Sequence, residues 1–260
     1  MTNILFIGDI VGAPGREFLA SRLPALMARY KADLVIANGE NAAGGNGLTP
    51  QVANEIFSMG VDVMTSGNHI WDKKEIYPFL DADRRVLRPI NYPPGAPGRG
   101  SGLFQARNGQ QVGIISACGR VFSPQNLDCP FRAVESEAHH LKLSTPTVVV
   151  DFHAEATSEK IAMGWYLDGK VSALLGTHTH VQTADETILP GGTAYITDAG
   201  MTGSRAGVIG VDKEIILKHF LTQLPVRHEV AKGKNHLCGV FCEIDSKGIA
   251  KAIERILISE

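Results

Sequence analysis

Five short apolar runs, each followed at once by polar residues, constrain the fold of this chain more than any other feature of its sequence. The runs are rich in Ile, Val and Leu, and their length suits strands that are buried on both faces of a sheet. They are Asn3–Ile7, Asp33–Ala37, Val61–Thr65, Thr147–Phe152 and Val171–Leu175. This pattern predicts an α/β protein built around parallel strands.

The segments between these runs predict helices and hairpins. Helical patterns cover Pro14–Tyr30, where Pro24 is a potential kink, and also Pro50–Met59 and Glu155–Leu167. Three hairpins are expected, one of them around an Asn-Gly turn signal. The paired segments are Leu103–Arg107 with Gln111–Ser116, Glu186–Leu189 with Thr193–Thr197, and Leu237–Asp245 with Ile249–Ile258. We therefore expect two mixed sheets flanked by helices, in a single domain that spans residues 1–260.

Charge and hydropathy argue against several classes of function. The formal net charge is −2 and no block of Lys or Arg appears, so a stable nucleic-acid complex is not expected. No apolar run reaches the length of about 18 residues that a membrane span needs, and Ile4–Ile7 is too short for the core of a signal peptide. We expect a cytoplasmic protein without membrane contact, whose four cysteines are small buried side chains rather than disulfides.

The polar residues that follow the apolar runs are the side chains that bind transition metals. They lie in Gly8-Asp9, Asn38–Asn41, Ser66–His69, His153 and Gly176–His180. Each has an ordinary alternative, because an Asp after Gly often caps a turn and a lone His is often a satisfied core residue. However, ligands gather beyond the carboxyl ends of parallel strands, so five coincidences at such positions favour a metal centre. His178 and His180 give the strongest signal, because residues i and i+2 on a strand point the same way and two imidazoles can then meet one metal cluster.

Taken together, these blocks resemble the calcineurin-like metallophosphoesterase superfamily, and most closely its YmdB-type branch of bacterial phosphodiesterases. The blocks that carry the branch resemblance are Gly8–Gly12, Asn38–Ala43, Gly67–Asp72, Asp151–Lys160 and Gly176–Asp185. The chain departs from the wider superfamily, because Val11, Glu40 and Ile70 stand where a His, a bridging Asp and an acidic residue are usual. The resemblance implies a four-layer α/β/β/α sandwich.

The same resemblance implies two metal ions per chain, with His69 left unligated as the catalytic acid. One ion would take Asp9, Glu40, Asn41 and His180. The other would take Glu40, Asn68, His153 and His178, with Glu40 bridging the two. Mixed nitrogen and oxygen ligands suit iron, manganese or zinc, and the branch favours iron.

Two neighbouring features have alternative interpretations. Cations near His69 oppose its protonated form, so an acceptor is required; Asp72 is one candidate, but it could equally cap a helix over Lys73–Leu80. The run Gly44–Gly47 could present backbone amides to a phosphate or form only a flexible loop.

The function expected from these residues and the resemblance is a phosphodiesterase that acts on 2′,3′-cyclic nucleotides. A metal-bound hydroxide would attack the phosphorus, and His69 would protonate the leaving oxygen. One alternative is a phosphomonoesterase or nucleotidase on the same site; another is a regulatory protein that binds metal or nucleotide with little turnover. The expected partner is a small phosphate ester, a nucleotide in the leading hypothesis, and the resemblance suggests a homo-oligomer.

Overall fold

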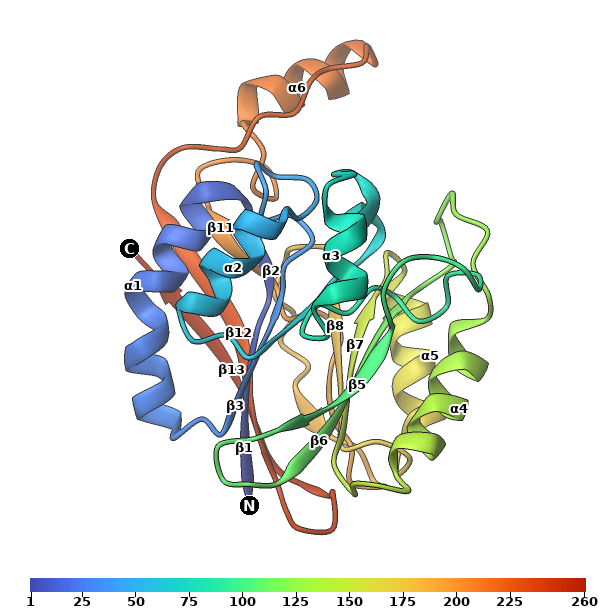
Figure 1. Ribbon diagram of the computed structural model, residues 1–260. Coiled ribbons are helices and arrows are strands. Elements are labelled where there is room, and N and C mark those ends of the chain that lie inside the picture. The colour runs from blue at the N-terminus through green and yellow to red at the C-terminus, as the bar shows by residue number, and fades with distance from the viewer.

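The computed structural model describes residues 1–260, which form two sheets packed face to face between layers of helices (Figure 1). The first sheet has the order β2-β11-β12-β1-β3-β4, and β13 pairs with β12 beside this path. Its strands are β1 (Thr2–Ile7), β2 (Asp9–Ile10), β3 (Leu34–Asn38), β4 (Val63–Thr65), β11 (Met201–Ser204), β12 (Asn235–Ile244) and β13 (Ala250–Ser259). Within this sheet, β1, β3 and β4 are parallel and β12 runs antiparallel to β1.

The second sheet has the order β5-β6-β7-β8-β10-β9. Its strands are β5 (Ser101–Gln105), β6 (Gln111–Cys118), β7 (Val148–His153), β8 (Ala173–Thr177), β9 (Thr187–Ile188) and β10 (Ala194–Ile196). Strands β6, β7, β8 and β10 are parallel, whereas β5 and β9 are antiparallel to their neighbours. All five predicted apolar strands and all three predicted hairpins are therefore confirmed, with boundaries that shift by a few residues.

Helices cover the outer face of each sheet. They are α1 (Gly12–Tyr30), α2 (Pro50–Ser58), the 3₁₀ helix η1 (Asn68–Trp71), α3 (Ile76–Ala82), α4 (Pro130–Leu141), α5 (Thr157–Leu167) and α6 (Lys213–Thr222). Helices α1 to α3 lie on the first sheet and α4 and α5 on the second, while α6 projects away from the sandwich (Figure 1). Helix α1 continues through Pro24, because Leu23 and Leu26 on either side of it are buried in one apolar cluster. None of the helices combines the length and the apolar composition that crossing a bilayer requires.

Alternating side chains along the strands explain the four layers. Along β1, Ile4 and Phe6 are buried between the two sheets, whereas Leu5 and Ile7 are buried under helices α1 and α2. On β7, Val149 faces the first sheet, and its neighbours Val148 and Val150 pack in the cluster that includes α4 and α5. Both faces of these strands are therefore apolar, which confirms the predicted α/β/β/α sandwich.

Candidate metal centre

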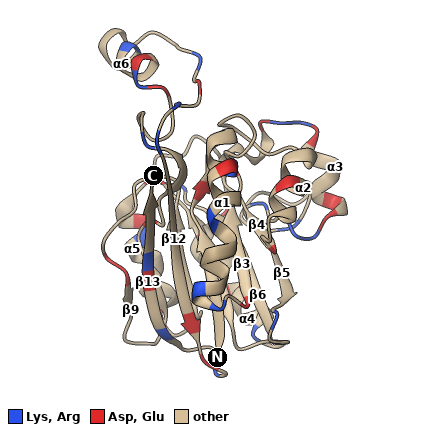
Figure 2. Ribbon diagram, turned by 90° about the vertical axis from the view of Figure 1, so that its left-hand side faces the viewer, with Lys and Arg blue, Asp and Glu red and all other residues tan.

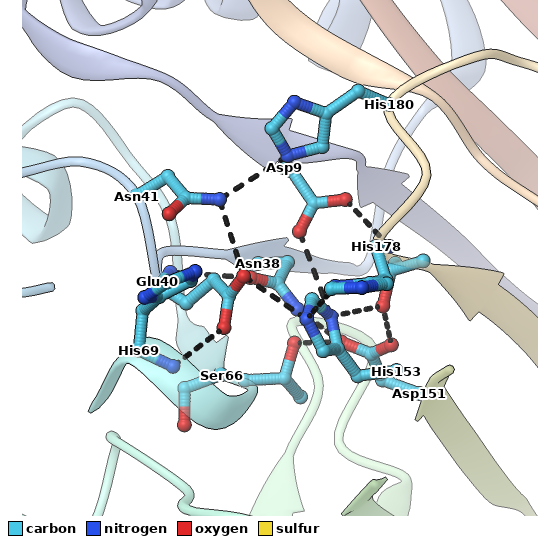
Figure 3. Close-up of polar contacts among 12 residues, drawn as sticks. Asp9, Asn38, Glu40, Asn41, Ser66, His69, Asp151, His153, His178 and His180 are labelled. Atoms are coloured by element: carbon cyan, nitrogen blue, oxygen red, sulfur yellow. Dashed lines mark hydrogen bonds and ion pairs between the residues drawn. The ribbon is translucent and has the colours of Figure 1, made fainter. Parts of the chain in front are cut away.

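All the predicted site residues lie where the parallel strands of the two sheets end, and Figure 3 labels all of them except Asn68. The first sheet supplies Asp9 after β1, Glu40 and Asn41 after β3, and Asn68 and His69 after β4. The second sheet supplies His153 at the end of β7, and His178 and His180 after β8. Asn68 lines the same pocket as His153 and His178. The cluster therefore joins the two sheets at one edge.

A glycine next to the cluster permits this close approach. A Cβ atom on Gly67 would lie 2.1 Å from His153 Cδ2 and 2.3 Å from Glu40 Oε2. Side chains from both sheets thus fill the space that any other residue would need at this position.

The centre of the cluster is formed by Glu40, His153 and His178, whose possible ligand atoms all lie within 4.8 Å of one another. Glu40 Oε1 is 3.0 Å from His153 Nε2, which is itself 2.9 Å from His178 Nδ1. Glu40 and His153 are buried, and His178 is about three-quarters buried. Such spacing between a carboxylate and two imidazoles suits a shared metal ion.

Hydrogen bonds behind the cluster orient both histidines. Thr177 Oγ1 donates to Asp151 Oδ1 at 2.7 Å, so it accepts from His153 Nδ1 at 2.9 Å. His178 Nε2 lies 2.9 Å from Glu155 Oε2, which makes it the donor nitrogen of that ring. His153 Nε2 and His178 Nδ1 therefore face each other, and two lone pairs at this distance repel unless a cation lies between them.

The pKa values of Glu40, His153 and His178 indicate that a positive charge is favoured at His153 Nε2, between Glu40 and His178. Burial lowers the pKa of His153, but the charge of Glu40 and its hydrogen bond outweigh burial and raise that pKa to about 9. Burial raises the pKa of Glu40, yet His153 and the other histidines lower it to about 2. Burial and the neighbouring His153 charge lower the pKa of His178 to about 3. Without metal, a proton on His153 Nε2 thus takes the position that a metal ion would occupy.

Asp9 lies on the other side of His153 and lacks a full set of partners. Its Oδ2 accepts from the backbone N of His178 at 3.0 Å, whereas its buried Oδ1 has no hydrogen-bond partner. Burial raises the pKa of Asp9 to about 6, despite the nearby charges of His153 and His180. A second cation would supply the partner that the buried Asp9 Oδ1 lacks, so the residues fit a metal centre.

Asn41 and His180 form a second group of possible ligand side chains around Glu40. Asn41 Nδ2 lies 3.1 Å from Glu40 Oε1 and 3.2 Å from His180 Nε2. His180 Nδ1 lies 2.8 Å from the carbonyl oxygen of Ile209, which leaves Nε2 as the acceptor. Rotation of the Asn41 amide exchanges its nitrogen and oxygen, so the same position can present an oxygen ligand.

The prediction that His178 and His180 point the same way because they lie on one strand was wrong. Strand β8 ends at Thr177, and both histidines lie beyond it with left-handed φ angles of 102° and 65°. Asp198 stabilises this turn, because its Oδ2 accepts from Thr179 N at 3.1 Å and from Thr179 Oγ1 at 2.7 Å. A turn held by the Asp198 carboxylate, rather than strand alternation, brings the two imidazoles to the cluster.

His69 lies at the edge of the site and is partly exposed. Its backbone N donates to Glu40 Oε2 at 3.2 Å, and its Nδ1 lies 2.8 Å from Asp72 Oδ2. Asp72 is thus the partner of His69, whereas the residue that precedes helix α3 is Glu75. In the glycine run, Gly45 N donates to Asn41 O at 3.2 Å, so this amide is already used within the loop.

Two supporting pairs had not been predicted from the sequence. One is the Asp151–Thr177 pair behind His153, and the other is the buried ion pair of Lys160 Nζ with Asp198 Oδ2, at 2.7 Å. Asp151 and Lys160 belong to the block Asp151–Lys160 that resembles the family, so the sequence marked both residues without showing what they contact. Their partners, however, lie far along the chain and only the fold reveals them.

Comparison with known proteins agrees with this geometry. The family model of YmdB-like proteins matches residues 5–256. The 2′,3′-cyclic-nucleotide 2′-phosphodiesterase of Bacillus subtilis strain 168 is 51% identical, over 99% of this chain and 97% of that protein. A hypothetical protein from Thermus thermophilus has a crystal structure with a TM-score of 0.93 and 43% identity, covering 100% of both chains.

A novel phosphatase from Mycoplasma pneumoniae has a crystal structure that is also similar, with a TM-score of 0.93 and 34% identity. The match covers 99% of this chain and 93% of the phosphatase. These relatives confirm the predicted enzyme class, a hydrolase. The motifs at the strand ends, the four-layer fold and the full-length matches lead to one conclusion: the chain belongs to the YmdB-like protein family.

Proposed function

We propose that this chain is a dinuclear-metal phosphodiesterase that hydrolyses 2′,3′-cyclic nucleotides. The observation that carries the proposal is the position of Glu40, whose Oε1 lies 3.0 Å from His153 Nε2 and 3.1 Å from Asn41 Nδ2. One carboxylate thus borders two groups of ligand side chains, as a bridging ligand between two ions must. The name of the Bacillus subtilis relative supports the choice of ester.

The ligands divide into two groups that share Glu40. Asp9, Glu40, Asn41 and His180 form the first group. Glu40, Asn68, His153 and His178 form the second. Nitrogen and oxygen donors suit iron, manganese or zinc better than magnesium or calcium, and family membership favours iron. Two such ions would acidify a water molecule and stabilise charge on the phosphoryl oxygens.

The charge of the ligands suits an anionic substrate. Asp9 and Glu40 are the only formal anions among the seven proposed ligands, so two divalent ions would leave a net charge of about +2. The neutral carboxamides and imidazoles coordinate without cancelling this charge. A phosphate ester is thus attracted to the site although the whole protein carries a net charge of −2.

His69 is the proposed acid for the leaving oxygen. The carboxylate of Asp72 holds Nδ1 at 2.8 Å, which leaves Nε2 as the nitrogen that can donate to substrate. The His69 side chain is 34% exposed, so a substrate can reach it.

The test compares two diesters in the His69→Ala variant. Hydrolysis of a cyclic nucleotide, whose leaving group is a ribose alkoxide, should slow by about 10²–10⁴-fold. Hydrolysis of bis(p-nitrophenyl) phosphate should slow far less, because p-nitrophenolate departs without a proton. Metal content should stay at about two ions per chain. The matched control is His140→Ala, which removes an exposed imidazole from α4. Equal losses on both diesters would refute the acid role.

A wider panel of substrates separates the remaining alternatives. Turnover of monoesters without turnover of diesters would indicate a nucleotidase on the same metal site. Tight binding of nucleotide without turnover of any ester would indicate a regulatory protein. The presence of His69 beside the cluster favours turnover, because a protein that only binds a nucleotide needs no leaving-group acid.

The proposed setting is the cytoplasm, with a small nucleotide as the partner and neither a membrane nor a stable nucleic-acid complex. All four cysteines are free, which fits a reducing compartment. Figure 2 shows Lys and Arg dispersed over several elements with Asp and Glu among them, rather than gathered in one basic track. A homo-oligomer stays a prediction from the family resemblance.

A further inference from the structure

A pocket beside the metal centre has an exposed aromatic ring in its wall. The pocket has a volume of about 110 Å³, below the roughly 300–1,000 Å³ of sites that enclose a whole small molecule, so it is a recess that would contact part of a ligand. Asn68, His153 and His178 form part of the wall, and the loop between β6 and α4 forms another part. Phe122 lies in this loop and is 84% exposed.

The start of this loop is fixed by the protein core. Glu159 is 8% exposed, and its carboxylate accepts from the backbone N of Arg120 at 3.0 Å and of Val121 at 3.1 Å. Gly119 permits this contact, because a Cβ atom there would lie 2.4 Å from Glu159 Oε2. Helix α5, which carries Glu159, therefore sets where Phe122 is presented.

Phe122 combines two features that ordinary loop residues avoid. Its φ is 63°, in the left-handed region where a bulky side chain is disfavoured. Its ring is exposed to solvent, although burial of an aromatic ring is strongly favourable. Residues in unfavourable backbone conformations are enriched at functional sites, and this one adjoins the proposed metal ligands.

We propose that Phe122 is a stacking platform for the base of the nucleotide substrate, an inference that rests on the proposed function. A cyclic phosphate bound at the metal centre carries its ribose and base outward, and the pocket wall beyond the ligands offers Phe122. Aromatic side chains stack on every base, because every base has a π face. The site would thus accept several nucleotides and favour purines, which present the larger face.

The experiment removes the ring and the base in turn. We compare adenosine 2′,3′-cyclic phosphate with 1-O-methylribose 2′,3′-cyclic phosphate, which has the same reacting group and no base. Phe122→Ala should raise KM for the nucleotide by roughly 5- to 100-fold, with little change in kcat. KM for the ribose ester should be unchanged. Phe122→Trp should retain the KM of the wild type, because it keeps a π face.

The matched control is Phe220→Ala, which removes a 65% exposed ring from α6 and should leave both substrates unaffected. An unchanged nucleotide KM in Phe122→Ala, or an equal rise for both substrates, would overturn the stacking role while leaving the phosphodiesterase proposal intact.

Equilibrium binding of adenosine 3′-monophosphate, with inorganic phosphate as the ligand without a base, separates the two proposals. If the wild type turns over neither ester but Phe122→Ala weakens nucleotide binding alone, the proposed function fails and the stacking platform stands. If nucleotide binding is the same in the variant and the wild type, the platform is refuted.

Discussion

Replacing Lys160 by Met tests the buried ion pair beneath the turn that carries two proposed metal ligands. Lys160 Nζ lies 2.7 Å from Asp198 Oδ2, and the two side chains are 1% and 0% exposed. Loss of one partner of a buried pair destabilises a protein by about 3–5 kcal/mol, because the other charge is left without compensation. Asp198 keeps hydrogen bonds from Thr179 and Gly200, so we expect a loss of about 3 kcal/mol, at the lower end.

The assay is thermal unfolding of the metal-free protein, so that metal binding does not mask the change. For a chain of this size, about 3 kcal/mol corresponds to a fall in Tm of roughly 6–12 °C. The double variant Lys160→Met/Asp198→Asn should recover most of this loss, because it removes both charges.

Lys170→Met is the matched control for this experiment. Lys170 Nζ is also 2.7 Å from a carboxylate, that of Glu135, but these side chains are 45% and 41% exposed. Water solvates such a pair, so the control should leave Tm unchanged within error. Equal shifts in Lys160→Met and Lys170→Met would refute the argument that burial determines the cost.

Four substitutions test the proposed metal centre, with elemental analysis as the common measurement. Glu40→Gln should deplete both ions, because one carboxylate serves both groups of ligands. Asn41→Ala and Asn68→Ala should each deplete a different ion, which anomalous scattering from crystals of the two variants can locate. Gly67→Ala should also lose metal, because its Cβ would lie 2.1 Å from His153 Cδ2 and 2.3 Å from Glu40 Oε2, so both ligands must shift.

Each of these predictions has a result that would contradict it. Full metal content in Glu40→Gln would contradict the bridging role. Depletion of the same ion in both Asn variants would show that the ligands are divided differently. Unchanged metal content in Gly67→Ala would show that the cluster adapts to an added methyl group.

The clustering of the proposed ligands could be predicted because strand ends leave a strong local signal. An apolar run that stops at Gly8-Asp9 or at Asn38–Asn41 identifies both the strand and the polar group at its carboxyl end. Once several such strands share a sheet, their ends share an edge, so the cluster follows from topology. The two-residue strand β2 and the four-residue strand β11 were not predicted, because their pairing partners are distant and their sequences carry too few residues for a pattern.

Long-range polar contacts could not be predicted in the same way. Lys160 is a buried cation in a helix, and nothing near it in the sequence identifies Asp198 as its partner. The left-handed φ angles of His178 and His180 could not be predicted either, because the Gly-Thr-His-Thr-His pattern is compatible with a strand that continues through both histidines. Helix α4 was overlooked although Val134, Ala138 and Leu141 repeat at helical spacing and are buried.

The central place of β12 in the first sheet has a consequence for biosynthesis. This strand pairs with β1 and β11, and Gly8 N donates to Cys238 O beside the proposed ligand Asp9. β12 leaves the ribosome after all seven proposed ligands, so one edge of β1 stays open during most of translation. An open, apolar strand edge is a template for association with other chains. The nascent chain should therefore depend on chaperones until β12 closes the sheet, and only then can Asp9 take its final position.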